Sequence, residues 1–399
     1  MGTILSRRMS LGLLGGLVGV AGLPGLALAS AATRKRFVLV ILRGGMDGLS
    51  AAPPYGDPDY VTARAGLAIP GPGEAGGALK LDGTFGLAPE LAYAHALYGA
   101  KELLLVHAAA TPYRDRSHFD GQNLLENGTA KPYGASDGWV NRALAGLPPA
   151  ATAGAKDLGV ALASRMPLAL TGSAPVTNWS PTVAPPPTDD TLARIGALYD
   201  EADPMLADAF RKAEAANAMA GGNRPDGDPY QSLARAAARF LLAEEGPRVA
   251  VLELGGWDTH ARQLGAYSAL GRNLATLDLG LKLLKEGLGP VWNETIVVAL
   301  SEFGRTVAMN GSGGSDHGTG GIVLLAGGAL AGGRVLADWP GLKPKDLYES
   351  RDLRTTTDAR AVIKGILADH MGIAEAHLAR TVFPDSADAK PVAGLVRPA

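Results

Sequence analysis

Histidine and carboxylate side chains gather in a few short, glycine-containing turns of this 399-residue chain. Each turn follows or precedes a short apolar run of the kind that forms a strand covered on both faces. Carboxylates and imidazoles without thiolates suit a hard to borderline divalent metal ion such as Zn, Mn, Ca or Mg. The chain contains no Cys, which excludes a cysteine nucleophile, a Cys-ligated zinc site and an iron–sulfur cluster. The turns hold Asp47, Ser117 with His118, Asp258 with His260, Glu302 with Arg305, and Asp316 with His317.

The apolar runs alternate with helical patterns along the chain. This alternation predicts an α/β fold with a mostly parallel central sheet and helices on both faces. In such sheets, ligands bind beyond the carboxyl ends of the strands, so we expect at least three of the turns to share one pocket. Strands are expected at 37–42, near His107, at 157–164 and 167–172, and before Gly255, Ser301 and Leu330; helices are expected over Pro89–Tyr98, His118–Glu126, Ala261–Gly287 and Asp358–Met371.

One stretch interrupts this alternation. An extended Pro-rich linker, 181–187, precedes residues 188–245, which indicate two or three Ala-rich helices and no strand. We expect this helical insertion to cover one edge of the sheet or to form a lid. Apart from this insertion, about 188–245, we expect residues 32–399 to form a single domain.

The N-terminal segment predicts export. Arg7 and Arg8 precede a long, Gly-rich, mildly apolar segment, and the small residues after it fit an A-x-A cleavage site at Ala27–Ala29 or Ala29–Ala31. A permanent membrane anchor is the alternative, which the glycines and the proline in the segment disfavour. We therefore predict that residues 1–31 are a twin-arginine signal peptide. The mature chain would be periplasmic or otherwise exported by the twin-arginine machinery, with no stable membrane span after cleavage.

Composition and motifs exclude several classes of function. The formal net charge is −2 and only 6% of residues are aromatic, so neither a basic footprint nor stacking platforms indicate a nucleic-acid partner. The chain has one G-x-S-x-G match, Gly134–Gly138, but it does not follow a predicted strand, so it gives no nucleophile elbow for a metal-free serine hydrolase. No G-x-G-x-x-G follows the first strand, which argues against a dinucleotide-binding protein.

Two interpretations remain open for Ser117 and for three arginines. Ser117 and Asp120 fit a capping box that opens a helix, but a hydroxyl at that helix start could also act as a nucleophile beside a metal. Arg43, Arg116 and Arg305 could hold a phosphate or sulfate group, or each could pair with a neighbouring carboxylate.

Together the turns resemble the exported domain-of-unknown-function family 1501, within the alkaline-phosphatase-like superfamily. The motifs that carry the resemblance are LRGGMDGLS, RSHFDGQNLLENG, GGWDTH, SEFGRT and SDHGTGG, between about Phe37 and Phe383. The resemblance implies a sulfatase- and phosphatase-like α/β fold. It also implies up to two metal ions per chain, bridged by a nucleophile.

The same resemblance implies roles for individual residues. Ser117 or His118 would be the nucleophile, and Arg305 or Arg43 would stabilise the anion. The superfamily has a metal-binding histidine at the position of Phe303, so the second site lacks its imidazole and a two-metal clamp is in doubt. The implied ligands are Asp258, His260 and His317 for one ion, and Asp47 with Glu302 for the other.

These observations lead to two functional hypotheses. The first is an exported, metal-dependent hydrolase of phosphate or sulfate esters, acting on a small molecule or a polymer. The second is a degenerate, non-catalytic, metal-stabilised binding or assembly protein of the cell envelope.

Overall fold

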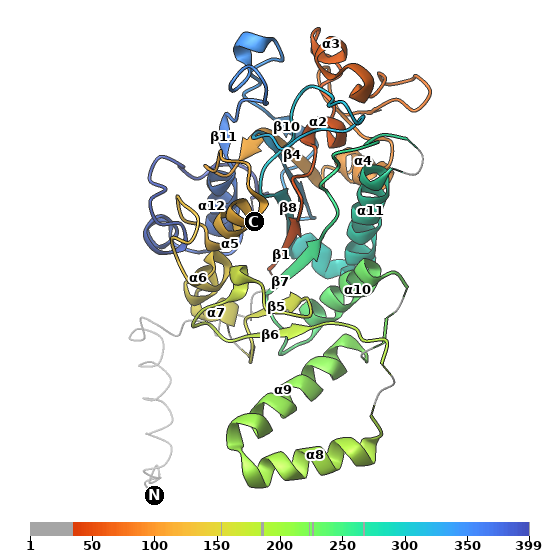
Figure 1. The fold of residues 1–399 in the computed structure, drawn as a ribbon. Helices are drawn as coiled ribbons and strands as arrows, with labels where there is room; N and C mark the ends of the chain where they lie inside the picture. The colour runs from red at the N-terminus through yellow and green to blue at the C-terminus, as the bar shows by residue number, and fades with distance from the viewer. Residues whose placement is uncertain are drawn as a thin grey trace, which may run out of the picture.

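The computed structural model describes residues 35–398 except 153, 185–186, 223, 226 and 266–267. The predicted signal peptide, 1–31, lies outside the described residues. Within the described part, nine strands form one central sheet in the order β10-β4-β9-β8-β1-β7-β5-β6, with β11 also paired to β4 (Figure 1). These strands are β1 (Arg36–Leu42), β4 (Leu103–Ala110), β5 (Gly159–Leu162), β6 (Val176–Trp179), β7 (Val249–Leu254), β8 (Thr295–Ser301), β9 (Gly321–Ala326), β10 (Arg334–Leu336) and β11 (Thr357–Asp358).

The sheet is mostly parallel, as predicted. Strand β1 runs parallel to both of its neighbours, β7 and β8, and β9 is antiparallel to β4 and β8. Strand β4 therefore points the same way as β8 and β1. The carboxyl ends of β1, β4, β7 and β8 and the beginning of β9 consequently lie at one edge of the sheet.

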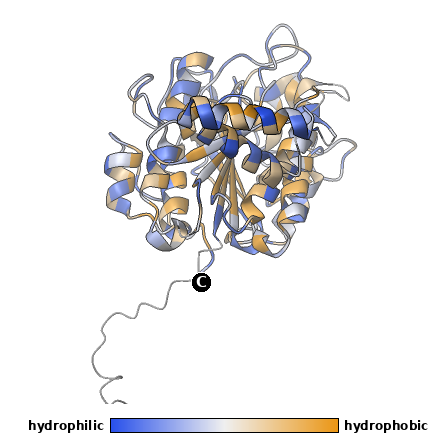
Figure 2. Ribbon diagram, turned by 90° about the horizontal axis from the view of Figure 1, so that it is seen from below, coloured by the Kyte–Doolittle hydropathy of each residue, from blue (hydrophilic) through white to orange (hydrophobic). Residues whose placement is uncertain are grey.

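Helices cover both faces of the sheet, and the predicted fold class is confirmed. Side chains of β1 alternate between the two sides. Val38, Val40 and Leu42 pack in one core with α10 (Pro229–Leu242) and α11 (Ala269–Leu288), whereas Phe37 and Leu39 pack in the other with α6 (Trp139–Ala145) and α12 (Ala359–Asp369). All seven residues of β1 are buried, which explains why the strand is apolar throughout. Figure 2 shows the apolar strands lying between the two groups of helices.

The helices lie close to the expected positions, with one difference at the start of α11. The packing helices are α4 (Ala92–Gly99), α5 (His118–Asn127), α6 (Trp139–Ala145), α10 (Pro229–Leu242), α11 (Ala269–Leu288) and α12 (Ala359–Asp369). Helix α11 begins at Ala269 rather than Ala261 because the Ser268 side chain caps it by accepting from Gly271 N. Ala261 itself lies outside the helix and bridges to Gly313.

The expected strand at 167–172 is wrong. Residues Leu168–Leu170 form a 3-10 turn, η2, and the edge strand is β6, which begins at Val176. The turn follows Pro167, whose carbonyl accepts from Leu170 N, and it ends before Gly172 at φ +155°. The mixture of Pro, Leu and Gly was apolar enough to suggest a strand but has the chemistry of a turn.

Residues 188–245 contain α8 (Asp189–Ala202), α9 (Pro204–Ala220) and α10. Helix α10 belongs to the main core, where it packs on α11. Helices α8 and α9 form a hairpin that packs on the edge strand β6 through α9, at the bottom of Figure 1, away from α2. The hairpin therefore lies at the edge of the sheet.

The remaining elements are short. They are α2 (Gly48–Ala51), α3 (Tyr60–Arg64), η1 (Ala65–Leu67), β2 (Leu79–Lys80), β3 (Gly86–Leu87), α7 (Pro149–Thr152), η3 (Gly289–Glu294), η4 (Pro344–Asp346), α13 (Glu375–His377) and η5 (Leu378–Val382). In the part of the chain that the structure describes, no helix combines the length and apolar character that a membrane span requires.

Candidate metal centre

The strand order brings four histidine- and carboxylate-bearing turns to one place. His118 is the first residue of α5, after β4; Asp258 and His260 follow β7; Glu302 follows β8; and His317 lies in the loop that enters β9. All of these positions lie at the edge where the carboxyl ends of β1, β4, β7 and β8 meet. The expectation that several turns share a site therefore agrees with where the fold places them.

Asp258, His260 and His317 form a tight triangle of possible ligand atoms. Asp258 Oδ1 lies 3.0 Å from His260 Nε2 and 3.2 Å from His317 Nε2, and the two Nε2 atoms are 3.0 Å apart. Tetrahedral coordination with bonds of about 2.0–2.1 Å separates neighbouring ligand atoms by about 3.3 Å. The triangle thus has nearly the dimensions of one face of such a coordination shell.

Hydrogen bonds at the far side of each ring aim Nε2 into the triangle. His260 Nδ1 lies 3.1 Å from Asp316 Oδ1, and His317 Nδ1 lies 2.9 Å from the carbonyl of Arg116. Because both partners only accept, each Nδ1 carries the proton and donates it. In the neutral ring, Nε2 then holds a lone pair, which is the form that binds metals.

His118 approaches the opposite oxygen of the Asp258 carboxylate. Its Nε2 lies 3.3 Å from Asp258 Oδ2, and its Nδ1 donates to Glu302 Oε1 over 2.8 Å. Glu302 is fully buried, and its hydrogen bond raises the pKa of His118 above the usual value. Apart from Asp258, the buried Nε2 of His118 has no polar partner among the described residues.

This arrangement fits a cation. Three acceptor atoms converge, one of which, Asp258 Oδ1, also accepts from Arg305, and burial lowers the pKa of His317, which favours its neutral ring. One ligand atom each from His118, Asp258 and His317 lies within 4.8 Å of the others. Imidazole nitrogens with one carboxylate are donors suited to zinc and similar borderline ions.

Glu302, a predicted ligand of the second ion, is engaged by several hydrogen-bond donors in this structure. Its two oxygens accept from His118, from Gln122 Nε2 at 3.1 Å, from Ser301 Oγ at 2.8 Å and from the backbone N–H of Gly44. Gly44 has φ +123°, and a Cβ there would lie 2.7 Å from Asp258 N. The glycine therefore lets the first turn approach the Asp258 loop closely.

Asp47, the other expected ligand of a second ion, is also engaged elsewhere. It is fully buried, and its Oδ2 accepts from Arg64 at 2.5 Å and from Ser50 Oγ at 3.0 Å. Its Oδ1 accepts from Leu49 N and Ser50 N at the start of α2. Burial alone would raise the pKa of Asp47, but the buried Arg64 beside it holds the pKa below its usual range. The carboxylate is a buried ion-pair partner and helix cap.

Gln263 is a site residue that the sequence did not reveal. It is fully buried; its Nε2 donates to Asp47 Oδ2 and to Ser50 Oγ, and its Oε1 accepts from Thr259 Oγ1 at 3.0 Å and Ser315 Oγ at 2.5 Å. Thr259 lies between Asp258 and His260, and Ser315 is two residues before His317. One amide thus ties together both loops that carry the triangle. A glutamine in a loop gives no signal of such a role.

Ser117 stands at the N-cap of α5, but the capping-box interpretation is wrong. Its side chain makes no cap hydrogen bond, and the Asp120 carboxylate accepts instead from Tyr113 Oη at 3.4 Å. The Ser117 amide donates to the same Tyr113 hydroxyl, at 3.1 Å. Tyr113 thus accepts from the Ser117 amide in place of Asp120, and the Ser117 hydroxyl is not used as a cap.

The three arginines expected to hold an anion all contact carboxylates. Arg305 donates to Asp258 Oδ1 at 2.5 Å and to the Ser315 carbonyl. The other ion pairs are Arg43 with Glu126 and Glu253, and Arg116 with Asp352 and Glu349. The pairing interpretation is therefore the one that the structure supports.

Phe303 forms an apolar wall of the site. Its ring is buried with Tyr113 and Leu124, and its centroid lies 4.9 Å from that of His118 and 5.3 Å from that of His317. A phenyl ring cannot bind a metal. Asp47 and Glu302 are engaged by other partners, so among the described residues the geometry favours a single ion site at the triangle.

Comparisons with known proteins give one family and several weak structural similarities. The family model described as "Protein of unknown function (DUF1501)" matches residues 94–383. No curated protein matches the chain. Ps i-CgsB in complex with k-i-k-neocarrahexaose has 12% identity and a TM-score of 0.41, covering 90% of this chain and 77% of that one.

Two further structures show the same level of similarity. Phosphonate monoester hydrolase of Agrobacterium radiobacter has 12% identity and a TM-score of 0.37, over 85% of this chain and 74% of that one. A TAB5 alkaline phosphatase mutant with Mg bound has 12% identity and a TM-score of 0.38, over 77% and 95%. Since these TM-scores lie below 0.5, the chemistry of the site rests on the residues of this chain.

Proposed function

The chain belongs to the family described as "Protein of unknown function (DUF1501)", and we propose that it is an exported, metal-dependent hydrolase of phosphate or sulfate esters. The observation that carries the proposal is the triangle of Asp258, His260 and His317, in which both rings are fixed through Nδ1 and present Nε2. Export rests on the twin-arginine pattern at Arg7 and Arg8.

In this proposal Asp258, His260 and His317 hold one divalent ion. A bound ion of this kind polarises the ester and stabilises the negative charge that develops during hydrolysis. Three protein ligands leave a coordination position open, which is the pattern of catalytic rather than structural zinc sites. The site is accessible, since the side chains of Asp258 and His260 are 41% and 44% exposed. An open site accommodates an ester on a small molecule or on a polymer.

His118 is proposed to hold or move a proton at Nε2. That atom faces Asp258 Oδ2, on the other side of the carboxylate from the triangle, and has no further polar partner among the described residues. Glu302 fixes the ring and favours its protonated form. A buried carboxylate behind a histidine orients the ring for acid–base work. Ser117, one residue earlier and without a cap hydrogen bond, is the proposed nucleophile.

A second function, a metal-stabilised binding or assembly protein, is favoured by two specific observations. Phe303 occupies the place expected for an imidazole, and the arginines expected to hold an anion are engaged with carboxylates. In that case His118 would be a fourth ligand. Four protein ligands would close the coordination shell, as in structural zinc sites.

The role of His118 therefore separates the two functions, and His118→Asn tests it. Asparagine retains a donor that can reach Glu302, so the loop keeps its anchor. We would measure bound metal by plasma mass spectrometry, and turnover of 4-nitrophenyl phosphate and 4-nitrophenyl sulfate, on the purified mature chain. The hydrolase proposal expects one ion per chain in both proteins and turnover lowered at least about 100-fold in the variant.

Other outcomes would contradict the proposal in identifiable ways. Loss of the ion from His118→Asn, with no ester hydrolysed by the metal-loaded wild type, would favour the closed site and the binding or assembly function. An unchanged ion content in His317→Ala would remove the triangle as the metal site, whatever the turnover. Gln122→Asn is a matched control, because Gln122 contacts Glu302 without belonging to the triangle.

A further inference from the structure

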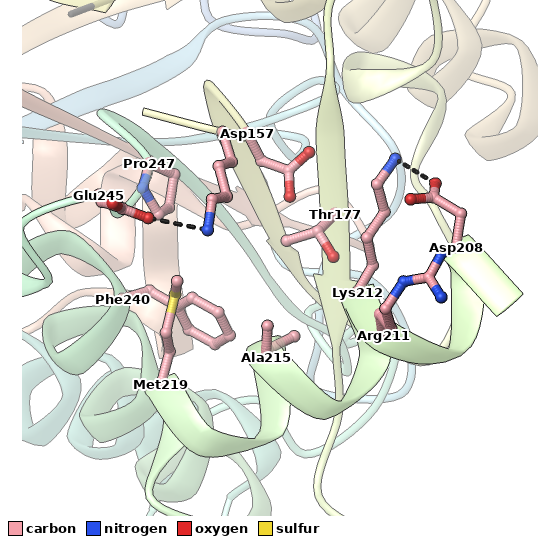
Figure 3. A pocket seen from close by; sticks show the side chains of 12 residues that line it. Asp157, Thr177, Asp208, Arg211, Lys212, Ala215, Met219, Phe240, Glu245 and Pro247 are labelled. Carbon is pink, nitrogen blue, oxygen red and sulfur yellow. Dashed lines mark ion pairs between the residues drawn. The ribbon is translucent and has the colours of Figure 1, made fainter. Parts of the chain in front are cut away.

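A second pocket lies at the opposite end of the sheet from the candidate metal centre. It has a volume of about 240 Å³ and is formed where α9 packs over the edge strand β6 (Figure 3). Lys156 and Asp157 come from the segment before β5, Thr177 from β6, and Pro247 from the segment before β7. The pocket therefore lies near the amino ends of β5 and β7, whereas the metal-binding triangle lies beyond the carboxyl ends of the strands.

One side of the pocket is apolar. Phe240 of α10 and Ala216 of α9 are buried members of the main core, and Met219 packs against that core. In Figure 3 the Phe240 ring, Met219 and Ala215 lie below the polar side chains of Asp157 and Thr177. A cavity of this volume is smaller than the pockets of about 300–1,000 Å³ that take drug-sized ligands. It fits a single ring or a branched aliphatic group.

The basic side chains of the pocket each have an acidic partner. Lys156 Nζ lies 2.9 Å from Glu245, Lys212 Nζ lies 3.1 Å from Asp208, and Arg211 lies 2.6 Å from Asp200 of α8. In each pair the acidic side chain neutralises the basic one, so the three pairs add no net charge to the pocket.

Asp157 is the acidic group left over. Within the described residues its carboxylate makes no hydrogen bond or ion pair, and Lys212 influences it only at longer range. Burial raises the pKa of Asp157, as expected for a partly desolvated carboxylate that lacks a donor. Thr177 likewise makes no side-chain hydrogen bond among the described residues. Two oxygen acceptors thus face a cavity whose opposite side is apolar.

We propose that this pocket binds a small primary amine with an apolar body, its ammonium group donating to Asp157 and Thr177 and its apolar group packing on Phe240 and Met219. An ammonium group has three donors and no acceptor, which matches two oxygen acceptors, one of them a carboxylate without an ion-pair partner among the described residues. An anionic ligand would meet an unpaired carboxylate, and a zwitterion would have to break an existing ion pair. The amine can be a free molecule or the N-terminus of a peptide.

Binding to the mature chain tests the proposal, with 2-phenylethylamine as the probe and calorimetry or NMR shifts as the measurement. We expect saturable binding of the amine and none of phenylacetate, which has the same ring and the opposite charge. Asp157→Asn preserves the shape and removes the charge, so it should weaken binding at least about tenfold. Glu201→Gln is the control, since Glu201 is an exposed carboxylate of α8 outside the pocket.

A second variant tests the location without changing charge. Ala215→Leu places a larger side chain at the pocket from an exposed position on α9, and it should also weaken binding. A tripeptide amide beginning with phenylalanine separates the sources: equal affinity assigns the pocket to peptide N-termini, and loss of affinity assigns it to free amines.

Three results would overturn the proposal: no binding of either amine at millimolar concentration, equal binding by wild type and Asp157→Asn, or tighter binding of phenylacetate. The metal content of Asp157→Asn should equal that of the wild type, because the pocket and the triangle lie at opposite ends of the strands. This readout keeps the pocket's result separate from the outcome at the metal centre.

Discussion

The buried carboxylate of Glu302 provides the sharpest test of the proposed chemistry, and Glu302→Gln is the change to make. The glutamate accepts hydrogen bonds from His118 Nδ1, Gln122, Ser301 and the Gly44 amide. Glutamine can keep one carbonyl oxygen toward His118. Its new amide donor can face Ser301, whose hydroxyl also contacts the Leu42 carbonyl at 2.5 Å and can donate there while accepting from the amide. The change therefore removes the charge and preserves the packing.

The size of the effect follows from the hydrogen bond at His118 Nδ1. A hydrogen bond to a charged group contributes about 1.5–3 kcal/mol, and a neutral one about 0.5–1.5 kcal/mol. Glu302→Gln should therefore reduce the free-energy preference for the protonated His118 ring by about 1–2 kcal/mol. If that proton is used in the reaction, this reduction is equivalent to a rate about 5- to 30-fold lower. Since Glu302 raises the pKa of His118, the pKa of the ring should fall in the variant.

Two measurements check this reasoning. An NMR titration of the His118 ring should give a lower pKa in Glu302→Gln than in the wild type. Turnover of the 4-nitrophenyl esters should fall about 5- to 30-fold, with metal content unchanged. Asp316→Asn is the matched control. The Asp316 carboxylate contacts His260 Nδ1 as Glu302 contacts His118 Nδ1, but it is 51% exposed, so removing its charge should lower turnover less than Glu302→Gln does. Equal titration and turnover in Glu302→Gln and wild type would refute the reasoning.

Three further predictions concern stability and the metal site. Asp47→Asn should lower the free energy of unfolding by about 3–5 kcal/mol, because it leaves buried Arg64 without its counter-charge. Metal per folded chain should stay the same, and a lower content would restore Asp47 as a ligand. Gln263→Leu should weaken metal affinity about 10- to 100-fold in a chelator competition, because it releases both ligand loops; unchanged affinity would show that the loops hold their geometry without it. Burial lowers the pKa of His107 and of His370 from 6.5 to about 4. Between these two pH values the unfolded chain therefore binds more protons than the folded chain, and the free energy of unfolding falls as the pH decreases. The expected loss is about 2 kcal/mol per histidine between neutral pH and pH 5. In urea unfolding at the two pH values, His107→Gln and His370→Gln should each lose less stability on acidification than the wild type; equal losses would contradict the assignment.

The sequence was sufficient for the fold class and for the family. Continuous apolar runs such as Phe37–Leu42 favour strands covered on both faces, and the structure places this run at the centre of the sheet with every residue buried. The family resemblance carried by the glycine-containing turns is confirmed by the match over residues 94–383. Local signals were weaker where Pro and Gly mix with leucine, as at 167–172, because apolarity alone does not distinguish a strand from a turn.

The sequence also located the triangle, for a reason of topology. Asp258, His260 and His317 stand at strand ends, and ligands in α/β sheets bind at the carboxyl edge of the strands. That rule needs no knowledge of strand order. It identifies which turns share an edge, and the antiparallel strand β9 adds the loop of His317 to that edge because it begins there.

What only the tertiary structure decided is which polar side chains remain available for chemistry. Asp47, Glu302 and Arg43 have the residue types expected of ligands and anion holders, yet each is engaged by partners between 17 and 258 positions away in the chain. Gln263 and Asp157 gave no signal in the sequence, and their roles depend on which partners surround them or are lacking. A side chain's type and local spacing are written in the sequence. How many of its lone pairs and protons already have hydrogen-bond partners depends on every element packed around it. A side chain with free lone pairs is available as a ligand, whereas one whose lone pairs are all occupied serves as a structural ion-pair partner.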